Sequence, residues 1–302
     1  MSIKAVFVGT GMIGTGLASC AILRDFDVTL YDLDPDMESK VKASLDRIYG
    51  ILIDAGVTTK AEVDEKIGRV RFTHDLKEAV DGADFIQESI SERLELKQSV
   101  YRQIQEITGE ETIICSSTSQ LFPSALSEGA LYPGSILCGH PYNPSYLLPL
   151  IEICGGATGS QAAIEKAIKI YEAMGKAPVV CKKETTGFIV NKLSWAAMDA
   201  AKAAVADGVC SVDDMDKAII YGPGLRMAVT GQILTLSLGI QGGFREAAAK
   251  YGKEPDPVDI ILADGIDEAL PRRPKEKGQT VEEIEIWRDK MFAEILKLHG
   301  ML

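Results

Sequence analysis

Apolar and polar positions alternate in blocks along the first 183 residues. Short runs rich in apolar residues predict strands that are buried on both faces. These runs lie at 5–8, 28–31, 69–76, 84–90, 112–119, 135–143, 149–156 and 176–183. Apolar residues at helical spacing predict helices at 13–23, 37–50, 77–83, 92–108 and 160–175, the last with Ser160 as its N-cap. This order predicts an α/β fold of the Rossmann type, with a doubly wound, mainly parallel sheet.

After Lys183 the strand-like runs stop and only helical patterns continue. They lie at 185–209, 211–222, 230–252 and 256–266, and a last helix follows the polar segment 271–280. Thr280 and Glu283 have the spacing of a capping box at the start of that last helix. The chain of 302 residues also exceeds the roughly 100–200 residues that are usual for one domain. We therefore expect a Rossmann domain over 1–183 and an all-α C-terminal domain over 184–302.

Composition narrows the class of protein. The formal net charge of -12 gives no basic footprint for nucleic acid, and no uncharged apolar run reaches the ~18 residues of a membrane span. The six cysteines include no C-x-x-C pair, and the start "MSIKAVFVG" lacks a signal-peptide layout. We expect a soluble cytoplasmic protein with no nucleic-acid or membrane partner and no metal site.

The strongest local motif is a glycine-rich turn between a strand and a helix. Gly9 permits a tight turn, Gly11 lets a pyrophosphate approach the backbone, and Gly14 allows close packing of helix on strand. A second strand ends in Asp32, where a carboxylate can bind a ribose 2′-hydroxyl and repel a 2′-phosphate. A glycine-rich turn alone could serve packing, but all these parts together indicate NAD. The predicted cofactor contacts in this motif are Gly9, Gly11, Met12, Ile13, Gly14 and Asp32.

His140 is the histidine best placed for chemistry. His74, at the end of a strand, and His299, near the chain end, are expected to be exposed and without a role. His140 instead ends a strand at the edge of the sheet where Rossmann-type enzymes bind ligands. Glu152 lies in an otherwise apolar run, and a buried carboxylate needs a partner. If the strands that carry these two residues are neighbours, His140 and Glu152 form an acid/base pair. A purely structural His–Glu bridge is the alternative.

These motifs resemble the L-3-hydroxyacyl-CoA dehydrogenase family over nearly the whole chain. That family has an H-x-x-N-P turn, a glutamate twelve residues after the histidine and a serine 21 residues before it; "HPYNP", Glu152 and Ser119 match. Its P-G-F-I-x-N-R signature appears here as "TGFIVNK", in which Asn191 matches while Thr186 and Lys192 depart. The resemblance implies that His140 takes the hydroxyl proton, Glu152 steadies the ring, and Ser119 and Asn191 bind the reacting oxygen.

The resemblance also extends to the cofactor, the substrate and the oligomer. "QESISERLELKQSV" is similar to the family's cofactor-contacting segment, which implies that Glu92, Lys97 and Ser117 lie near NAD; a solvated helix face is the alternative for the first two. "GHPYNPSYLLPLIEICGG" and "YGPGLRMAVTG" resemble family members that act on free acids, the L-carnitine and L-gulonate 3-dehydrogenases. Relatives pair through the helical domain, which implies a homodimer.

A free-acid substrate such as L-carnitine assigns roles to several further residues. Arg226 could bind a carboxylate, unless it forms a structural salt bridge. Aromatic rings could hold a quaternary ammonium group, although each ring alone is typical of a core. The predicted substrate contacts are Asn143, Arg226, Tyr142, Tyr146 and Trp195. A 3-hydroxybutyryl-CoA dehydrogenase is the main alternative, with Lys40 and Lys42 as phosphate partners, and a structural protein like lambda-crystallin is a third.

Overall fold

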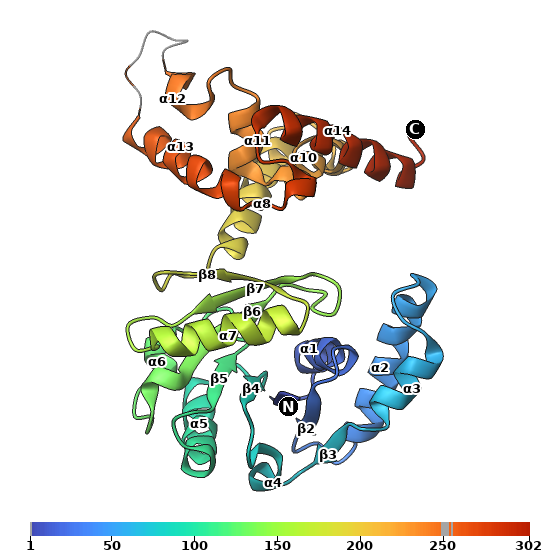
Figure 1. Cartoon of the computed structure of the whole chain (residues 1–302), viewed down its shortest axis with the longest axis vertical. Helices are drawn as coiled ribbons and strands as arrows, with labels where there is room; N and C mark the ends of the chain where they lie inside the picture. Colours follow the sequence, from blue (N-terminus) through green and yellow to red (C-terminus); the bar gives the residue numbers. More distant parts are fainter. Residues whose placement is uncertain (1, 249–253, 255) are drawn as a thin grey trace. The chain divides into compact units, whose positions relative to one another are not determined.

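The computed structural model describes residues 2–248, 254 and 256–302 (Figure 1). The chain forms two compact units, Met1–Ala196 and Ala197–Leu302. In the described part of the chain, no helix combines the length and the apolar character needed to span a membrane.

The first unit contains one sheet of eight strands in the order β3-β2-β1-β4-β5-β6-β7-β8. Every neighbouring pair is parallel except β6 and β7, which are antiparallel. The Rossmann-type prediction is therefore confirmed. The strands are β1 (Lys4–Val8), β2 (Asp27–Tyr31), β3 (Arg71–Thr73), β4 (Phe85–Glu88), β5 (Ile113–Ser116), β6 (Ile136–Pro141), β7 (Leu150–Cys154) and β8 (Ala177–Val180).

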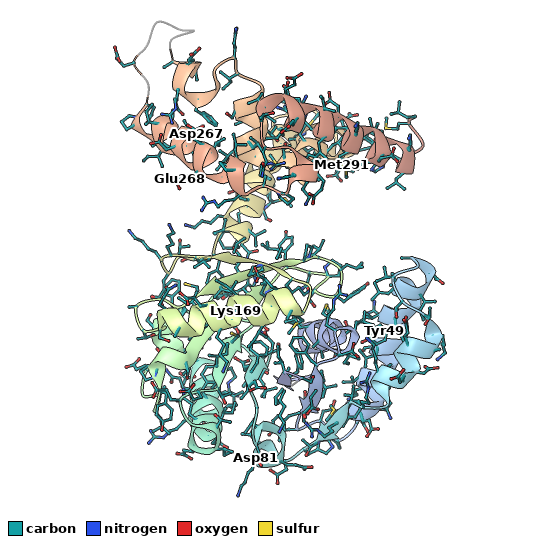
Figure 2. All side chains as sticks on the ribbon, in the orientation of Figure 1. Tyr49, Asp81, Lys169, Asp267, Glu268 and Met291 are labelled. Carbon is teal, nitrogen blue, oxygen red and sulfur yellow. The ribbon has the colours of Figure 1, made fainter. Side chains whose placement is uncertain are left out.

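Helices cover both faces of this sheet because alternate strand residues point to opposite sides. Ala5 and Phe7 of β1 belong to one buried cluster, with α1, α2 and α7, whereas Val6 and Val8 belong to another, with α4, α5 and α6. On the first face lies Tyr49 of α2, which is labelled in Figure 2. Its hydroxyl donates to the Ser19 carbonyl of α1. The helices are α1 (Met12–Leu23), α2 (Met37–Asp54), α3 (Lys60–Ile67), α4 (Leu76–Val80), α5 (Leu94–Thr108), α6 (Pro123–Leu126) and α7 (Gln161–Ala173).

The region from α2 to α4 differs most from the prediction. Helix α3 was not predicted, although Thr59 and Glu62 form a capping box before it. Strand β3 is shorter than the predicted 69–76, because the Asp75 side chain accepts the amides of Lys77 and Glu78 and begins α4 there. His74, between the two, is exposed, and its Nδ1 lies 2.7 Å from the Asp32 carbonyl oxygen.

The second unit is helical throughout its described residues, as predicted. The predicted helix over 230–252 is interrupted, because Gly231, Gly242 and Gly243 have positive φ; its residues 249–252 lie outside the described residues. The capping box of Thr280 and Glu283 is confirmed. The helices of the second unit include α8 (Val190–Ala206), which starts in the first unit, α9 (Val212–Ile219), η2 (Ile220–Gly224), α10 (Leu225–Thr230), α11 (Gln232–Leu238), α12 (Gly243–Ala247), α13 (Pro257–Ala269) and α14 (Val281–Leu298).

Candidate active site

The pairing of β6 and β7 brings His140 and Glu152 together. The two residues are direct partners in the antiparallel register, as the sequence predicted for neighbouring strands. His140 Nδ1 lies 2.9 Å from Glu152 Oε2, and the glutamate is fully buried while the histidine is 8% exposed. The His140 ring also stacks on Phe188 with centroids 5.4 Å apart. Because Nδ1 is occupied by the carboxylate, Nε2 is the nitrogen that can exchange a proton with a substrate.

The second oxygen of Glu152 is held by the start of a helix, which sequence reasoning missed. Its Oε1 accepts the backbone amides of Ile189 and Val190 at 2.8 and 3.0 Å, where α8 begins. A helix N-terminus stabilises a carboxylate charge, and the charged carboxylate in turn stabilises an imidazolium. Glu152 is thus the link between the helix start and the His140 ring.

The turn that aims these amides depends on the glycine of the "TGFIVNK" stretch. Gly187 has a φ of +73°, and the next residue, Phe188, has a φ of +50°. A Cβ on Gly187 would lie 2.4 Å from the Trp195 ring. Alanine at position 187 would combine an unfavourable backbone conformation with a close contact to the Trp195 ring, so the turn favours glycine.

Ser119 and Asn191 have side chains available to a ligand. Ser119 follows the end of β5, and Asn191 lies in the first turn of α8, directly after Val190. Both residues are half-buried, and neither side chain forms a hydrogen bond within the described part of the chain. Each can donate a hydrogen bond to a substrate oxygen.

The glycine-rich turn has the geometry that a dinucleotide needs. Gly9 has a φ of +92°, and a Cβ on Gly14 would lie 2.0 Å from the Gly9 carbonyl oxygen. A Cβ on Gly11, in contrast, would meet no atom within 4 Å, so the space in front of this residue is open. Met12 begins α1 and is 77% exposed, while Ile13 is half-buried against the core. The open backbone at the start of α1 suits a phosphate.

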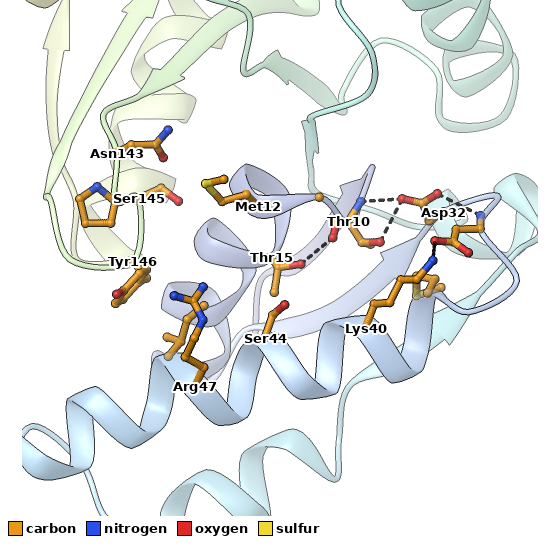
Figure 3. A pocket seen from close by; sticks show the side chains of 15 residues that line it. Thr10, Met12, Thr15, Asp32, Lys40, Ser44, Arg47, Asn143, Ser145 and Tyr146 are labelled. Atoms are coloured by element: carbon orange, nitrogen blue, oxygen red, sulfur yellow. Dashed lines mark hydrogen bonds and ion pairs between the residues drawn. The ribbon is translucent and has the colours of Figure 1, made fainter.

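A cavity of about 500 Å³ extends along this turn (Figure 3). Asp32 lies in its wall, and Asp32 Oδ2 accepts the Thr10 amide at 2.8 Å and the Thr10 hydroxyl at 2.9 Å. Lys40 is paired with Asp34 at 2.5 Å, which reduces its availability to a phosphate. Sequence reasoning missed several lining residues. Among them, Ser44 and Arg47 lie on one face of α2, and Ser145 lies two residues after Asn143.

Ser117 directly follows β5, Glu92 lies in the loop between β4 and α5, and Lys97 lies in the first turns of α5. Lys97 is only 1% exposed, so it does not lie on a solvated helix face; its Nζ is 2.7 Å from Glu88 Oε1 and 3.3 Å from Glu92 Oε2. Glu92 is 38% exposed and accepts the Thr118 hydroxyl. The Ser117 hydroxyl oxygen accepts a hydrogen bond from the side-chain amide of Gln87 at 2.8 Å. Of the two charged residues, Glu92 is the one that a ligand can reach.

The predicted substrate residues lie in different surroundings. The Tyr142 hydroxyl is 3.0 Å from Ser194 Oγ, next to the half-exposed Trp195. Tyr146 lines the Asp32 cavity with Asn143. Among the described residues these three aromatic rings do not stack on one another.

Arg226 is exposed at the start of α10, in the second unit. It forms no ion pair with any residue that the structure describes. Lys42, the other lysine considered for phosphate binding, pairs with Glu38 at 2.5 Å. No cluster of three or more potential metal ligands occurs in the described ranges.

Comparisons with known proteins agree over nearly the whole chain. Residues 4–185 match the 3-hydroxyacyl-CoA dehydrogenase, NAD binding domain, and residues 187–279 match the 3-hydroxyacyl-CoA dehydrogenase, C-terminal domain. The chain is 35% identical to the L-carnitine dehydrogenase of Pseudomonas syringae pv. syringae (strain B728a), covering 97% of this chain and 96% of the relative. The chain is 34% identical to the L-carnitine dehydrogenase of Streptomyces griseus subsp. griseus, covering 99% of this chain and 90% of the relative.

Solved structures share the fold. A 3-hydroxyacyl-CoA dehydrogenase from Archaeoglobus fulgidus gives a TM-score of 0.72 at 21% identity, over 99% of this chain and all of that one. A 5-formyl-3-hydroxy-2-methylpyridine 4-carboxylic acid 5-dehydrogenase, described as an NAD+ dependent dismutase, gives 0.73 at 24% identity, with both chains fully covered.

Proposed function

The chain belongs to the 3-hydroxyacyl-CoA dehydrogenase family, and we propose that it uses NAD to oxidise the 3-hydroxyl of a small L-3-hydroxy acid, L-carnitine, to the 3-keto acid. The observation that carries the reaction is the His140–Glu152 pair, whose geometry leaves Nε2 of the imidazole for the substrate. The substrate assignment is supported by relatives named L-carnitine dehydrogenase at 34–35% identity over nearly the full chain.

The residues of the chain move the proton and stabilise the charge. His140 Nε2 accepts the hydroxyl proton as the C3 hydride leaves, and NAD supplies the acceptor for that hydride. Glu152, held by the amides at the start of α8, stabilises the imidazolium that forms. Ser119 and Asn191 donate hydrogen bonds to the reacting oxygen, and one such donor can contribute roughly 3 kcal/mol in the transition state.

Cofactor recognition follows from the glycine-rich turn and the carboxylates beside it. The open backbone at Gly11 and the start of α1 at Met12 would hold the pyrophosphate. Asp32, fixed by Thr10, accepts a ribose hydroxyl and repels the 2′-phosphate of NADP. Glu92 would contact the ribose of the nicotinamide half of NAD. Lys97 acts through Glu92, because its ammonium is buried.

For the substrate, we assign Arg226 to the carboxylate. We assign Asn143 and the rings of Tyr142, Tyr146 and Trp195 to the rest of the substrate molecule. The absence of an ion pair at Arg226 among the described residues supports this assignment. We expect Arg226→Met to raise the KM for the free acid about tenfold or more while the Kd for NAD stays unchanged. Arg272→Met is the control, because Arg272 is an exposed arginine of the same unit with only a 3.8 Å contact to Glu268. An unchanged KM would remove Arg226 from the site.

An acyl-CoA is the second candidate substrate. The family's own name favours it, and Arg47 lines the cavity without an ion pair among the described residues. The pairing of Lys40 with Asp34 and of Lys42 with Glu38 counts against it, because a CoA ester carries several phosphate charges.

The test is NADH formation with L-carnitine and, separately, with L-3-hydroxybutyryl-CoA. Wild type is compared with His140→Ala and with His299→Ala, which removes an exposed histidine at the end of α14. Turnover of carnitine alone, lost only in His140→Ala, is the expected result. Turnover of the CoA ester alone would make that ester, in place of L-carnitine, the proposed substrate. No turnover of any 3-hydroxy acid would favour a structural role.

We also propose that the protein is a cytoplasmic homodimer that pairs through its helical unit. Only five side chains in the described part of that unit are buried, whereas Val209, Val212 and Ile261 are each at least 65% exposed. All six cysteines are free thiols, as in a reducing compartment. Sedimentation that shows only a 32.6 kDa species would contradict the dimer, and cell fractionation tests the location.

A further inference from the structure

Glu88 ends β4 and carries a carboxylate that is completely buried. Its Oε1 accepts hydrogen bonds from the Ile90 amide and from Lys97 Nζ, both at 2.7 Å. Its Oε2 accepts from the Ser116 hydroxyl at 2.8 Å and from the Tyr101 hydroxyl. Burial, with Glu88 beside it, raises the pKa of Tyr101 well above its usual value, so this hydroxyl stays a donor. Four donors from the β4 loop, α5 and β5 thus meet on one charge.

Lys97 carries this arrangement outward to Glu92. The ammonium donates to Glu88 Oε1 at 2.7 Å and to the Ile90 carbonyl at 3.3 Å, and it forms an ion pair with Glu92 Oε2 at 3.3 Å. Glu92 also accepts the Thr118 hydroxyl, in the loop that follows β5 and carries Ser119. The series Glu88, Lys97, Glu92 and Thr118 therefore joins the loops after two neighbouring strands.

These loops lie at the edge of the sheet where the cofactor binds. Glu88 is the register partner of Val8 in β1 and of Ser116 in β5. Gly9 follows Val8, and a Cβ on Gly9 would lie 2.7 Å from the backbone of Ser89, the residue after Glu88. Glu88 itself has no exposed surface. Its effect on a ligand must act through the residues that it holds.

We propose that Glu88 is a positioning residue: by fixing Lys97, it holds Glu92 and the Ser119 loop in the geometry that NAD binding requires. The inference rests on the proposed NAD-dependent function. A buried ion pair is a poor source of stability, because the loss of hydration offsets the attraction, and an apolar pair of similar volume is often as stable. The Glu88–Lys97 ion pair is therefore better explained by the orientation of Glu92 than by the stability of the fold.

The test separates orientation from stability with a double substitution. Glu88→Gln leaves the Lys97 charge without its main partner, so we expect lower thermal stability and a Kd for NAD at least about tenfold higher. Glu88→Gln/Lys97→Met removes both charges, so stability recovers, but Glu92 has lost its anchor and NAD binding stays weak. Glu106→Gln is the control, because it removes a carboxylate of the same helix α5 whose ion pair, with Arg102 at 3.6 Å, is exposed; it leaves the Kd within about twofold of wild type.

Direct NAD titration is the assay, beside thermal unfolding and the KM for the hydroxy acid. A double variant that recovers both stability and NAD affinity would overturn the proposal, as would a folded Glu88→Gln variant with a wild-type Kd. If the single variant does not fold, the double variant decides alone. Because the titration needs no turnover, it is independent of the substrate assignment; wild type that binds no NAD would instead refute the proposed function itself.

Discussion

Replacing Glu152 with glutamine tests the acid/base pair, because glutamine keeps the shape of the side chain but turns one acceptor oxygen into a donor. In the structure Oε1 accepts two backbone amides, from Ile189 and Val190, whereas Oε2 faces His140 Nδ1 at 2.9 Å. Two donors that cannot move favour the carbonyl oxygen of the new amide. Its NH2 group must then face Nδ1.

An NH2 group facing Nδ1 makes that nitrogen an acceptor, so the neutral ring carries its proton on Nε2. A ring in this tautomer cannot take the substrate proton. The equivalent wrong-tautomer substitution in a Ser-His-Asp triad lowers kcat about 10⁴-fold. We therefore expect Glu152→Gln to lower kcat/KM by roughly 10³- to 10⁴-fold, or about 4–5 kcal/mol of transition-state stabilisation.

The assay is the initial rate of NADH formation with L-carnitine, beside NAD titration and thermal unfolding. We expect NAD binding to be unchanged, since Glu152 does not line the glycine-rich turn. Glu184→Gln is the matched control: Glu184 also accepts a backbone amide and a side chain, the amide and hydroxyl of Ser124, yet holds no histidine. A Glu152→Gln rate within about threefold of wild type would refute the tautomer argument.

Three further predictions concern the turn, the cofactor and pH. Gly187→Ala lowers the melting temperature, because its Cβ would lie 2.4 Å from Trp195; a wild-type value contradicts this. Asp32→Ser increases the kcat/KM with NADP relative to NAD by about tenfold or more, since a repulsive charge is lost; an unchanged ratio excludes Asp32 from the ribose site. Burial raises the pKa of Cys181 from 9.0 to about 11, so the folded state retains a proton that the unfolded chain loses. The free energy of unfolding in urea therefore falls as pH rises from 9 towards 11, and less steeply in Cys181→Ala.

Features with strong local signals were predictable from the sequence. The turn from Gly9 to Gly14 and the carboxylate of Asp32 belong to one strand–helix–strand unit whose parts are neighbours in the chain. The His140–Glu152 pair was predictable for another reason: a buried carboxylate in an apolar strand needs a partner, and few were available. In both cases the physical constraint could be read from a short segment.

Features that depend on distant contacts were not predictable in this way. The periodicity of α5 treats Lys97 as a helix-face residue, but Glu88, on the neighbouring strand, makes a buried position possible for it. Similarly, the contact of Glu152 with α8 depends on the left-handed turn at Gly187 and Phe188, more than thirty residues later. Neither partner can be identified before the topology of the sheet is known.

The single antiparallel pair in the sheet explains why His140 and Glu152, the proposed acid/base pair, lie twelve positions apart. β7 returns beside β6, so Glu152 lies in the middle of its strand and opposite His140, near the carboxyl end of β6. The next parallel strand, β8, leads to the turn at Gly187, which places the first amides of α8 on Glu152. A substitution that moves this turn therefore weakens the hold on Glu152, and it also shifts Phe188, whose ring stacks on His140. Two contacts of the proposed acid/base pair therefore depend on the turn at Gly187: the backbone amides on Glu152 and the Phe188 ring on His140.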